Sequence, residues 1–141
     1  MSNILLNNER AVDTIIKVIG FAEMAENTGS SAQLTIGKIP AGGAVLNAGV
    51  YEKTALVGAS DITLDCGTTG GDPDEFIDEW DADAGTPAYN SGESFTTNFS
   101  QPVGIATADT DILVEINGTT GSLTAGEVVV VLEVINPGKF A

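Results

Sequence analysis

The sequence predicts an all-β fold, an antiparallel β-sandwich of jelly-roll-like form with about seven or eight strands and one short inserted helix. Three observations support this fold class. Most apolar segments are short and alternate with polar residues, as strands with one buried face do. Gly, Pro, Asn and Ser cluster between these segments, which is typical of turns. The last apolar segment is a nearly continuous run rich in β-branched residues.

Four strands are expected in the first half of the chain, at residues 12–21, 32–36, 45–56 and 61–66. The first of these fits a helical stripe as well as a buried strand, and its β-branched side chains favour the strand. The last alternates strictly and places Ile62, Leu64 and Cys66 inward. The single cysteine is therefore interpreted as a small buried apolar side chain and not as a reactive thiol.

Residues 67–94 are expected to form an irregular acidic insertion that contains the one helix. Seven of the twelve residues from Asp72 to Asp83 are acidic. The residues that favour a helix start are the N-cap candidate Asp72, Pro73 at the first helical position, and the capping partner Glu75. The residues expected to pack against the sheet from one helix face are Phe76, Ile77 and Trp80.

Four more strands are expected after this helix, at residues 94–99, 103–106, 111–116 and 127–135. The final strand is apolar at almost every position. This pattern predicts a central strand that is covered on both faces, or one that a neighbouring subunit covers. The domain organisation is thus an N-terminal arm, residues 1–11, followed by a single β-sandwich domain, residues 12–141.

Composition excludes several classes of function. The chain has 141 residues, a formal net charge of −15, no histidine and one cysteine. Five basic residues cannot supply the cationic surface that nucleic acid requires. Without histidine there is no His-based catalytic triad and no common zinc ligand set. No apolar run reaches the roughly 18 residues of a membrane span. We therefore expect no enzyme activity, no cofactor, no nucleic acid partner and no membrane partner.

The acidic segment is the one place where a metal site deserves consideration. The candidate calcium ligands are Asp72, Asp74, Asp78, Asp81 and Asp83. Asp81 and Asp83 have the spacing of the first two ligands of a calcium loop, but Gly85 stands where the third belongs. A solvated acidic surface is the preferred interpretation, with no metal. Two alternatives stay open: a calcium-dependent carbohydrate-binding β-sandwich with Trp80 as stacking platform, and a glycosidase that uses two of these carboxylates.

The order of several segments resembles a known family. The segments that carry the resemblance are residues 36–42 (IGKIPAG), 62–67 (ITLDCG), 71–78 (GDPDEFID), 104–112 (GIATADTDI) and the strand at 128–131. Together they resemble the capsid decoration (cement) proteins and related head structural proteins of tailed bacteriophages that infect marine bacteria and cyanobacteria. The resemblance implies a jelly-roll-like sandwich, a homotrimer on the outer shell, and a role in bridging major capsid protein subunits. It implies no catalytic residues.

The sequence therefore favours a non-enzymatic virion structural protein. It is expected to be made in the cytoplasm of a bacterial host and to bind the outer capsid surface, with the major capsid protein as its partner. A tail or head-fibre component is an alternative within the same class. In the N-terminal arm, Ile4, Leu5 and Leu6 form a short apolar segment, which is interpreted either as a partner-binding plug or as a frayed terminus.

Overall fold

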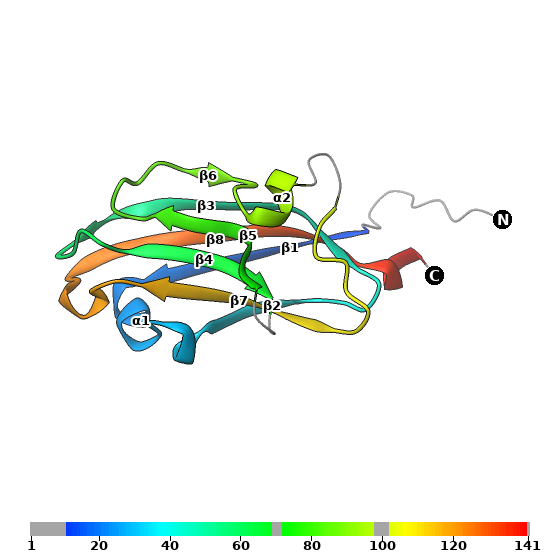
Figure 1. Cartoon of the computed structure of the whole chain (residues 1–141), viewed down its shortest axis with the longest axis horizontal. Coiled ribbons are helices and arrows are strands. Elements are labelled where there is room, and N and C mark those ends of the chain that lie inside the picture. The colour runs from blue at the N-terminus through cyan, green and yellow to red at the C-terminus, as the bar shows by residue number, and fades with distance from the viewer. Residues whose placement is uncertain (1–10, 69–71, 98–101, 141) are drawn as a thin grey trace.

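The computed structural model describes residues 11–68, 72–97 and 102–140 and contains two four-stranded antiparallel sheets (Figure 1). The β1 sheet has the strand order β1–β8–β3–β6, and the β2 sheet has the order β2–β7–β4–β5. The strands are β1 (Val12–Gly20), β2 (Leu34–Ile39), β3 (Ala44–Val57), β4 (Thr63–Thr68), β5 (Asp72–Asp81), β6 (Ala88–Tyr89), β7 (Thr110–Asn117) and β8 (Ala125–Ile135). The helical elements are α1 (Phe21–Glu26), α2 (Glu93–Thr97), η1 (Ser30–Ala32), η2 (Thr120–Ser122) and η3 (Pro137–Phe140).

Strand pairing confirms the jelly roll. β1 pairs with β8, β2 with β7, β3 with β6, and β4 with β5. The four strands of the first half thus pair, in reverse order, with the four of the second half, as in a jelly roll. β8 lies between β1 and β3 and is therefore central, as its apolar sequence predicts. None of the described helices is long and apolar enough to span a membrane.

The core lies between the two sheets and follows the period of two. In β8 the inward residues are Val128, Val130, Leu132 and Val134. In the facing sheet the expected set is confirmed, because Ile62, Leu64 and Cys66 are all at most 1% exposed. Each such aliphatic side chain contributes about 1.5–3 kcal/mol by leaving water, so one contiguous core is enough to hold the sheets together.

The helix expected after Asp72 is wrong, because this segment is the strand β5. Phe76, Ile77 and Trp80 are buried as predicted, but a bulged strand buries them. Between the pairs Leu64–Trp80 and Cys66–Ile77, one residue of β4 opposes two residues of β5. Glu79 absorbs this extra residue with a φ of 42°, and its N–H donates to Asp65 Oδ1 at 2.6 Å. The bulged strand thus buries Phe76, Ile77 and Trp80, which have the spacing that a helix face would also bury.

Two further expectations about this region are corrected. The strand expected at residues 94–99 is α2 where it is described, and Phe95 packs its ring against Phe76 with centroids 6.5 Å apart. The strand expected at residues 103–106 is a loop with a single bridge between Val103 and Val45. Gly104 has a φ of 64°, which ends the extended conformation there. The acidic segment 67–94 is therefore not an irregular insertion, since it supplies β5, β6 and α2.

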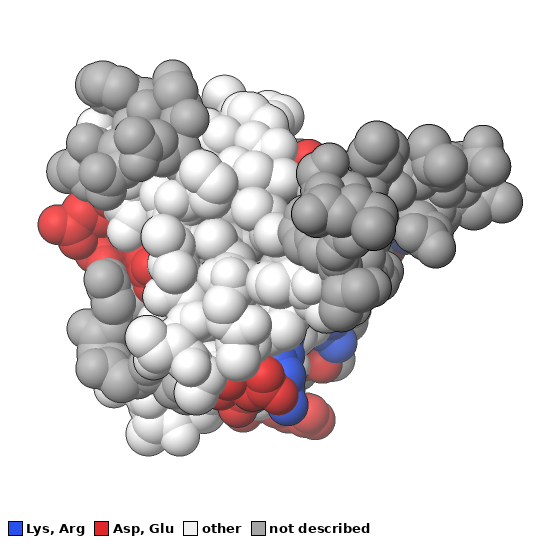
Figure 2. All heavy atoms as spheres, turned by 90° about the vertical axis from the view of Figure 1, so that its right-hand side faces the viewer, with Lys and Arg blue, Asp and Glu red and all other residues white. Residues whose placement is uncertain are grey.

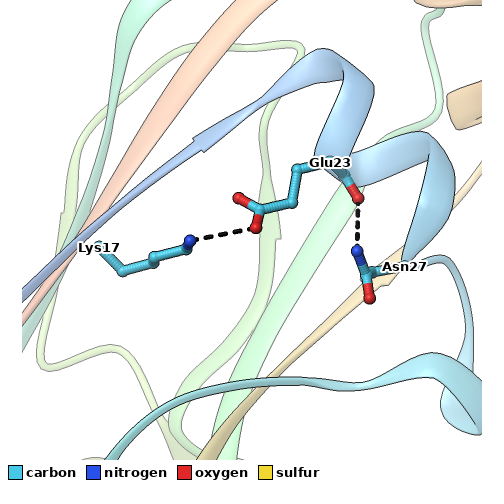
Figure 3. Close-up of polar contacts among 3 residues, drawn as sticks. All are labelled: Lys17, Glu23 and Asn27. Carbon is cyan, nitrogen blue, oxygen red and sulfur yellow. Dashed lines mark hydrogen bonds and ion pairs between the residues drawn. The ribbon is translucent and has the colours of Figure 1, made fainter.

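α1 follows β1 directly, and polar contacts hold it there (Figure 3). Lys17 Nζ lies 3.1 Å from Glu23 Oε2, which ties the strand to the helix. Asn27 Nδ2 donates to the carbonyl oxygen of Glu23 at 2.9 Å and so satisfies a carbonyl at the helix end. Met24 is 1% exposed and anchors the helix in the core.

Candidate functional site

The structure spreads the candidate calcium ligands along β5 and the loop that follows it. Asp81 Oδ1 accepts two backbone N–H groups, at 3.0 and 3.1 Å, and Asp83 Oδ2 accepts the N–H of Ile62 at 2.8 Å. These two carboxylates thus hold loop backbone in place. Asp74 and Asp78 lie on β5 itself, as does Asp72, whose side chain is outside the described part. Within the described residues, no three Asp, Glu or Cys side chains form a metal-binding group.

Trp80 does not form a platform for a sugar. Its side chain is 5% exposed, and Nε1 donates to the carbonyl oxygen of Thr86 at 2.7 Å. The ring faces the core, because Trp80 pairs in register with the buried Leu64. The stacking role expected of Trp80 in a carbohydrate-binding module is therefore wrong.

The outer face of the β2 sheet is acidic. Carboxylates on this face belong to three neighbouring strands, and they are Asp65, Asp78, Asp81, Asp111 and Glu115. Asp65 of β4 and Glu115 of β7 are direct cross-strand partners. Gln33 Nε2 donates to Glu115 Oε2 at 2.8 Å and screens part of the repulsion between these two acids.

Asp65 differs from its neighbours because it is almost buried, at 7% exposure. The pKa of Asp65 is raised to about 6, chiefly by burial and in smaller part by the nearby carboxylates of Glu115, Asp78 and Asp74, while the Glu79 N–H hydrogen bond opposes the change. Burial likewise raises the pKa of Glu75, whose Oε2 accepts from Thr68 Oγ1 at 3.1 Å. Asp65 on the acidic face and Glu75 beside Thr68 are thus two buried carboxylates that destabilise the fold when charged.

Cys66 lies inward beside these acids. It is 0% exposed, and burial raises the pKa of its thiol. The interpretation of Cys66 as a buried, unreactive side chain is confirmed.

One end of the sandwich is also acidic. This acidic end comprises α1 and the loops at 58–62, 82–87 and 118–124, with the carboxylates of Glu23, Glu26, Asp61, Asp81 and Asp83 (Figure 1, left). Asp61 is exposed, and its carboxylate accepts hydrogen bonds from the backbone N–H of Thr119, at 3.1 Å, and from the Thr119 hydroxyl, at 2.7 Å. These hydrogen bonds lower the pKa of Asp61 and fix one loop to the next.

The opposite end has a different composition. Its centre, which we call the uncharged end, comprises residues 40–43, 102–108 and 136–138 and contains no charged residue. Figure 2 shows this end: the described residues in the middle are uncharged, and acidic side chains lie toward the edges. Ile105 is 75% exposed and is the most exposed of the large apolar side chains on the described surface.

Backbone hydrogen bonds hold the uncharged end in one conformation. Gly42 N–H donates to Ala106 O at 2.7 Å, and Ala106 N–H donates to Gly43 O at 3.0 Å. Val45 and Val103 exchange both of their backbone hydrogen bonds, at 2.7 and 2.9 Å. A Cβ at Gly104 would lie 2.8 Å from the Phe76 ring, so only glycine lets this loop approach the core. Ile105 is therefore presented by a fixed loop.

The outer face of the β1 sheet carries an apolar patch, which consists of Ile16, Val18, Gly49, Tyr51, Tyr89, Val129 and Val131. The register places Ile16, Val131, Gly49 and Tyr89 in one row across all four strands. Val18, Val129 and Tyr51 form the next row. Ile16 is 64% exposed and Tyr89 is 66% exposed, whereas Val129 is 2% exposed beneath its neighbours.

Sequence reasoning only partly predicted this patch. The apolar run of β8 suggested cover by a neighbouring subunit, but the contributions of β1, β3 and β6 were missed. A signal was present in β1, where the doublets Ile15–Ile16 and Val18–Ile19 put apolar side chains on both faces of one strand. Tyr51 and Tyr89 join the patch only through pairing across the sheet, which the sequence does not display.

The expected partner-binding residues Ile4, Leu5 and Leu6 lie outside the described residues. The described chain begins beside the uncharged end, since Asn136 N–H donates to Ala11 O at 2.7 Å. Ala11, the first described residue, therefore lies at the uncharged end, next to η3.

No protein-family model and no curated protein sequence matches the chain. Its fold, however, is similar to chains in three solved phage capsids. The cyanophage Pam1 capsid asymmetric unit gives a TM-score of 0.64 at 18% identity, covering 97% of this chain and 93% of that one. The acid-stable capsid of Helicobacter pylori bacteriophage KHP30 gives 0.61 at 11% identity, covering 92% and 90%. The capsid of Ralstonia phage GP4 gives 0.54 at 16% identity, covering 94% and 90%.

These likenesses extend over nearly the whole length of both chains, so they concern the complete sandwich and not a shared substructure. At such low identity they establish the fold and carry no residue-level role. The resemblance to phage head proteins that the sequence motifs suggested is confirmed at this level. A cement role is not part of that confirmation.

Proposed function

We propose that this chain is a non-enzymatic phage virion protein that binds the outer capsid surface and stabilises the shell by bridging major capsid protein subunits as a homotrimer. The likeness to chains of three phage capsids over at least 90% of their lengths supports a capsid role. The division of the surface into acidic and uncharged regions supports a protein that acts through contact.

The single observation that carries the proposal is the uncharged end. A surface that binds another protein must lose its water, and desolvating a carboxylate without a partner is costly. The centre of the uncharged end avoids this cost, has a fixed backbone and exposes Ile105, and the adjoining carboxylate of Asp109 already accepts the Ala41 N–H at 3.0 Å. The acidic end and the acidic face avoid burial in such an arrangement and keep the chain soluble. We therefore assign the uncharged end to the shell.

The N-terminal arm fits the same assignment. Ala11 is hydrogen-bonded at the uncharged end, so Ile4, Leu5 and Leu6 are within reach of any surface that this end contacts. An apolar segment that orders on a partner adds buried area at the price of its own entropy. Many copies in symmetric contact then raise the free energy needed to separate the shell, since each copy binds only the assembled state.

The test is to mix the protein with undecorated capsids and image them by cryo-electron microscopy. The expected result is density on the outer surface with the uncharged end toward the shell. Ile105→Asp is expected to remove this density. Val57→Asp is the matched control, because Val57 is an exposed valine at the acidic end and is 51% exposed. Equal binding by both variants, or density that places the acidic end on the shell, would contradict the proposal.

A further inference from the structure

We infer that the apolar patch on the outer face of the β1 sheet is the surface through which copies of this chain bind one another. The inference deepens the proposed function, on which it rests for the number of copies. It concerns a different surface from the uncharged end, so the two contacts can be tested apart.

The patch has the composition of a protein-binding surface. Its four most exposed side chains are Ile16 at 64%, Val18 at 40%, Tyr51 at 43% and Tyr89 at 66%. Two tyrosines in an otherwise aliphatic patch are typical of interfaces, because their rings bury area while the hydroxyl stays satisfied. The remaining members form a floor in the middle, where Gly49 has no side chain and Val129 is covered.

Charge favours a second copy as the occupant. The patch contains no Asp, Glu, Lys or Arg, while the chain as a whole carries −15. Glu127 and Glu133 of β8 border it on the same face. A basic partner would find its complement on the acidic face or the acidic end, and not here. Two copies in contact through the patch keep both acidic faces in water, because those faces lie on the other sheet. Both bordering acids have a partner: Lys53 Nζ lies 4.0 Å from Glu127 Oε2, and Asn47 Nδ2 donates to Glu133 Oε1 at 2.9 Å.

Shape also favours a second copy. The patch has an aliphatic half on β1, with Ile16 and Val18, and an aromatic half on β3 and β6, with Tyr51 and Tyr89. The low floor at Gly49 separates the two halves. Copies that place the aliphatic half of one on the aromatic half of the next bury unlike, interlocking side chains. Where the rotation between successive copies closes, head-to-tail contact of this kind forms a ring, which is the symmetry that the proposed trimer needs.

The size of the patch sets the strength of the contact. Four strands at about 4.8 Å spacing and two outward rows give a footprint of roughly 300 Å². A stable pair buries about 800 Å² on each partner, so this contact is weak by itself. Repulsion between copies of net charge −15 weakens it further. We therefore expect monomers in dilute solution and association at high concentration or on a shell, strengthened by salt that screens the carboxylates.

Disulfide trapping tests the geometry directly. The native thiol of Cys66 is 0% exposed, so introduced cysteines are the reactive ones. Chains with Ile16→Cys are mixed with chains with Tyr89→Cys at about 0.5 mM and oxidised, a concentration chosen for a weak interface. The expected product is a mixed disulfide between positions 16 and 89. The matched control replaces Ile16→Cys with Thr35→Cys, which puts the thiol on the outer face of the β2 sheet. Equal trapping rates in both mixtures would overturn the inference.

Sedimentation equilibrium provides a second, independent measurement. The wild-type mass is expected to rise with concentration, and Ile16→Asp is expected to weaken association about ten-fold because it desolvates a charge in the contact. Thr35→Asp adds the same charge to the other sheet and is expected to leave the mass nearly unchanged. A wild-type mass that stays monomeric up to about 1 mM, or equal effects of the two variants, would contradict the inference.

The outcomes separate this inference from the proposed function. If Ile105→Asp still forms the disulfide between positions 16 and 89 but does not bind capsids, self-association through the patch and shell contact are two distinct activities. If the wild-type chain binds capsids and the mixture of Ile16→Cys and Tyr89→Cys chains shows no trapping above the control mixture, the proposed function stands and the inference fails. If trapping succeeds and no capsid is bound, the inference stands and the proposed function fails.

Discussion

The outer faces of the two sheets differ sharply, although the sheets have the same number of strands and share one core. On the β2 sheet several outward positions of neighbouring strands are carboxylates, with Lys38 opposite Asp111. In the middle of the β1 sheet the outward positions are valines, an isoleucine and tyrosines, and Glu127 and Glu133 border them along β8. Inward positions must be apolar in both sheets for the fold to form. Outward positions are free of that demand, so the inferred contact between copies would explain why the middle of the β1 sheet is apolar on its outer face.

Two residues make this comparison concrete. Asp65 and Val129 both point outward from strands inside their sheets, and both are nearly covered by neighbours, at 7% and 2% exposure. At Val129 the cover adds to stability, since an aliphatic group leaves water. At Asp65 the same degree of cover desolvates a charge next to Glu115. The buried charge of Asp65 on the acidic face therefore lowers the stability of the fold, whereas the buried Val129 in the apolar patch raises it.

The largest loss of stability is expected when a carboxylate, the side chain typical of the acidic face, replaces a valine of the apolar patch. Val129→Asp places a carboxylate where only 2% of the side chain is exposed, with no cation opposite it. We expect the free energy of unfolding to fall by about 3 kcal/mol or more. Thr35→Asp, on the acidic face, is the control and should change stability by about 0.5 kcal/mol at most. Urea denaturation at pH 8 measures both, and a loss below about 1 kcal/mol for Val129→Asp would show that the patch tolerates charge.

The next largest effect is on the pH dependence of stability, because the fold is expected to become more stable as the pH falls. The pKa of Asp65 is raised to about 6 in the folded state from 3.8, so between these values the folded chain binds more protons than the unfolded chain. Stability therefore increases as pH falls from 8 toward 4, by roughly 2 kcal/mol for this residue after allowance for screening. Glu75, whose pKa is also raised, acts in the same direction. Thermal melts from pH 8 to pH 4 measure the change.

Asp65→Asn identifies the residue responsible. Asparagine keeps an oxygen that accepts the Glu79 N–H and removes the buried charge. We expect the variant to be more stable than the wild type at pH 8 and to show a flatter pH dependence. An unchanged pH profile would assign the effect to other carboxylates.

The smallest effect is expected at the acidic end, where Asp61 is exposed. Its pKa is lowered by hydrogen bonds from Thr119, so it contributes stability above its unfolded pKa, and this contribution is lost as pH falls through the folded value. Asp61→Ala should lower the melting temperature slightly at pH 7 and have less effect at pH 3. Asp83→Ala, which frees the N–H of Ile62, is a useful comparison on the same end. An Asp61→Ala melt identical to the wild type would show that these exposed bonds add nothing measurable.

The fold class was predictable from local patterns, because alternation and turn residues report each strand without knowledge of its neighbours. β5 was not predictable in this way. Pro73 and Glu75 suit a helix start, and Phe76, Ile77 and Trp80 suit a helix face, yet pairing with β4 outweighs these local preferences. The signal for a strand lies in Asp65, whose carboxylate stabilises the bulge at Glu79 from another strand.

The candidate surfaces were less predictable than the fold. The charge of the acidic segment is plain in the sequence, whereas the uncharged end joins three segments, residues 40–43, 102–108 and 136–138, that are far apart in the chain. The apolar patch likewise depends on which strands are neighbours and in what register. Such surfaces arise from topology, and a local pattern contains only their fragments.

The pairing of the first strand with the last has a consequence for biosynthesis. Asn136 Nδ2 and Asp13 Oδ2 are hydrogen-bonded at 2.9 Å across a separation of 123 residues. β8, an inner strand of its sheet, is made after every other strand of the sandwich, so β1 and β3 cannot pair with it until the ribosome has made the whole sandwich. During that interval the nascent chain exposes unpaired strand edges, and its carboxylates repel other nascent chains. The high negative charge thus opposes aggregation of the chain before it has folded.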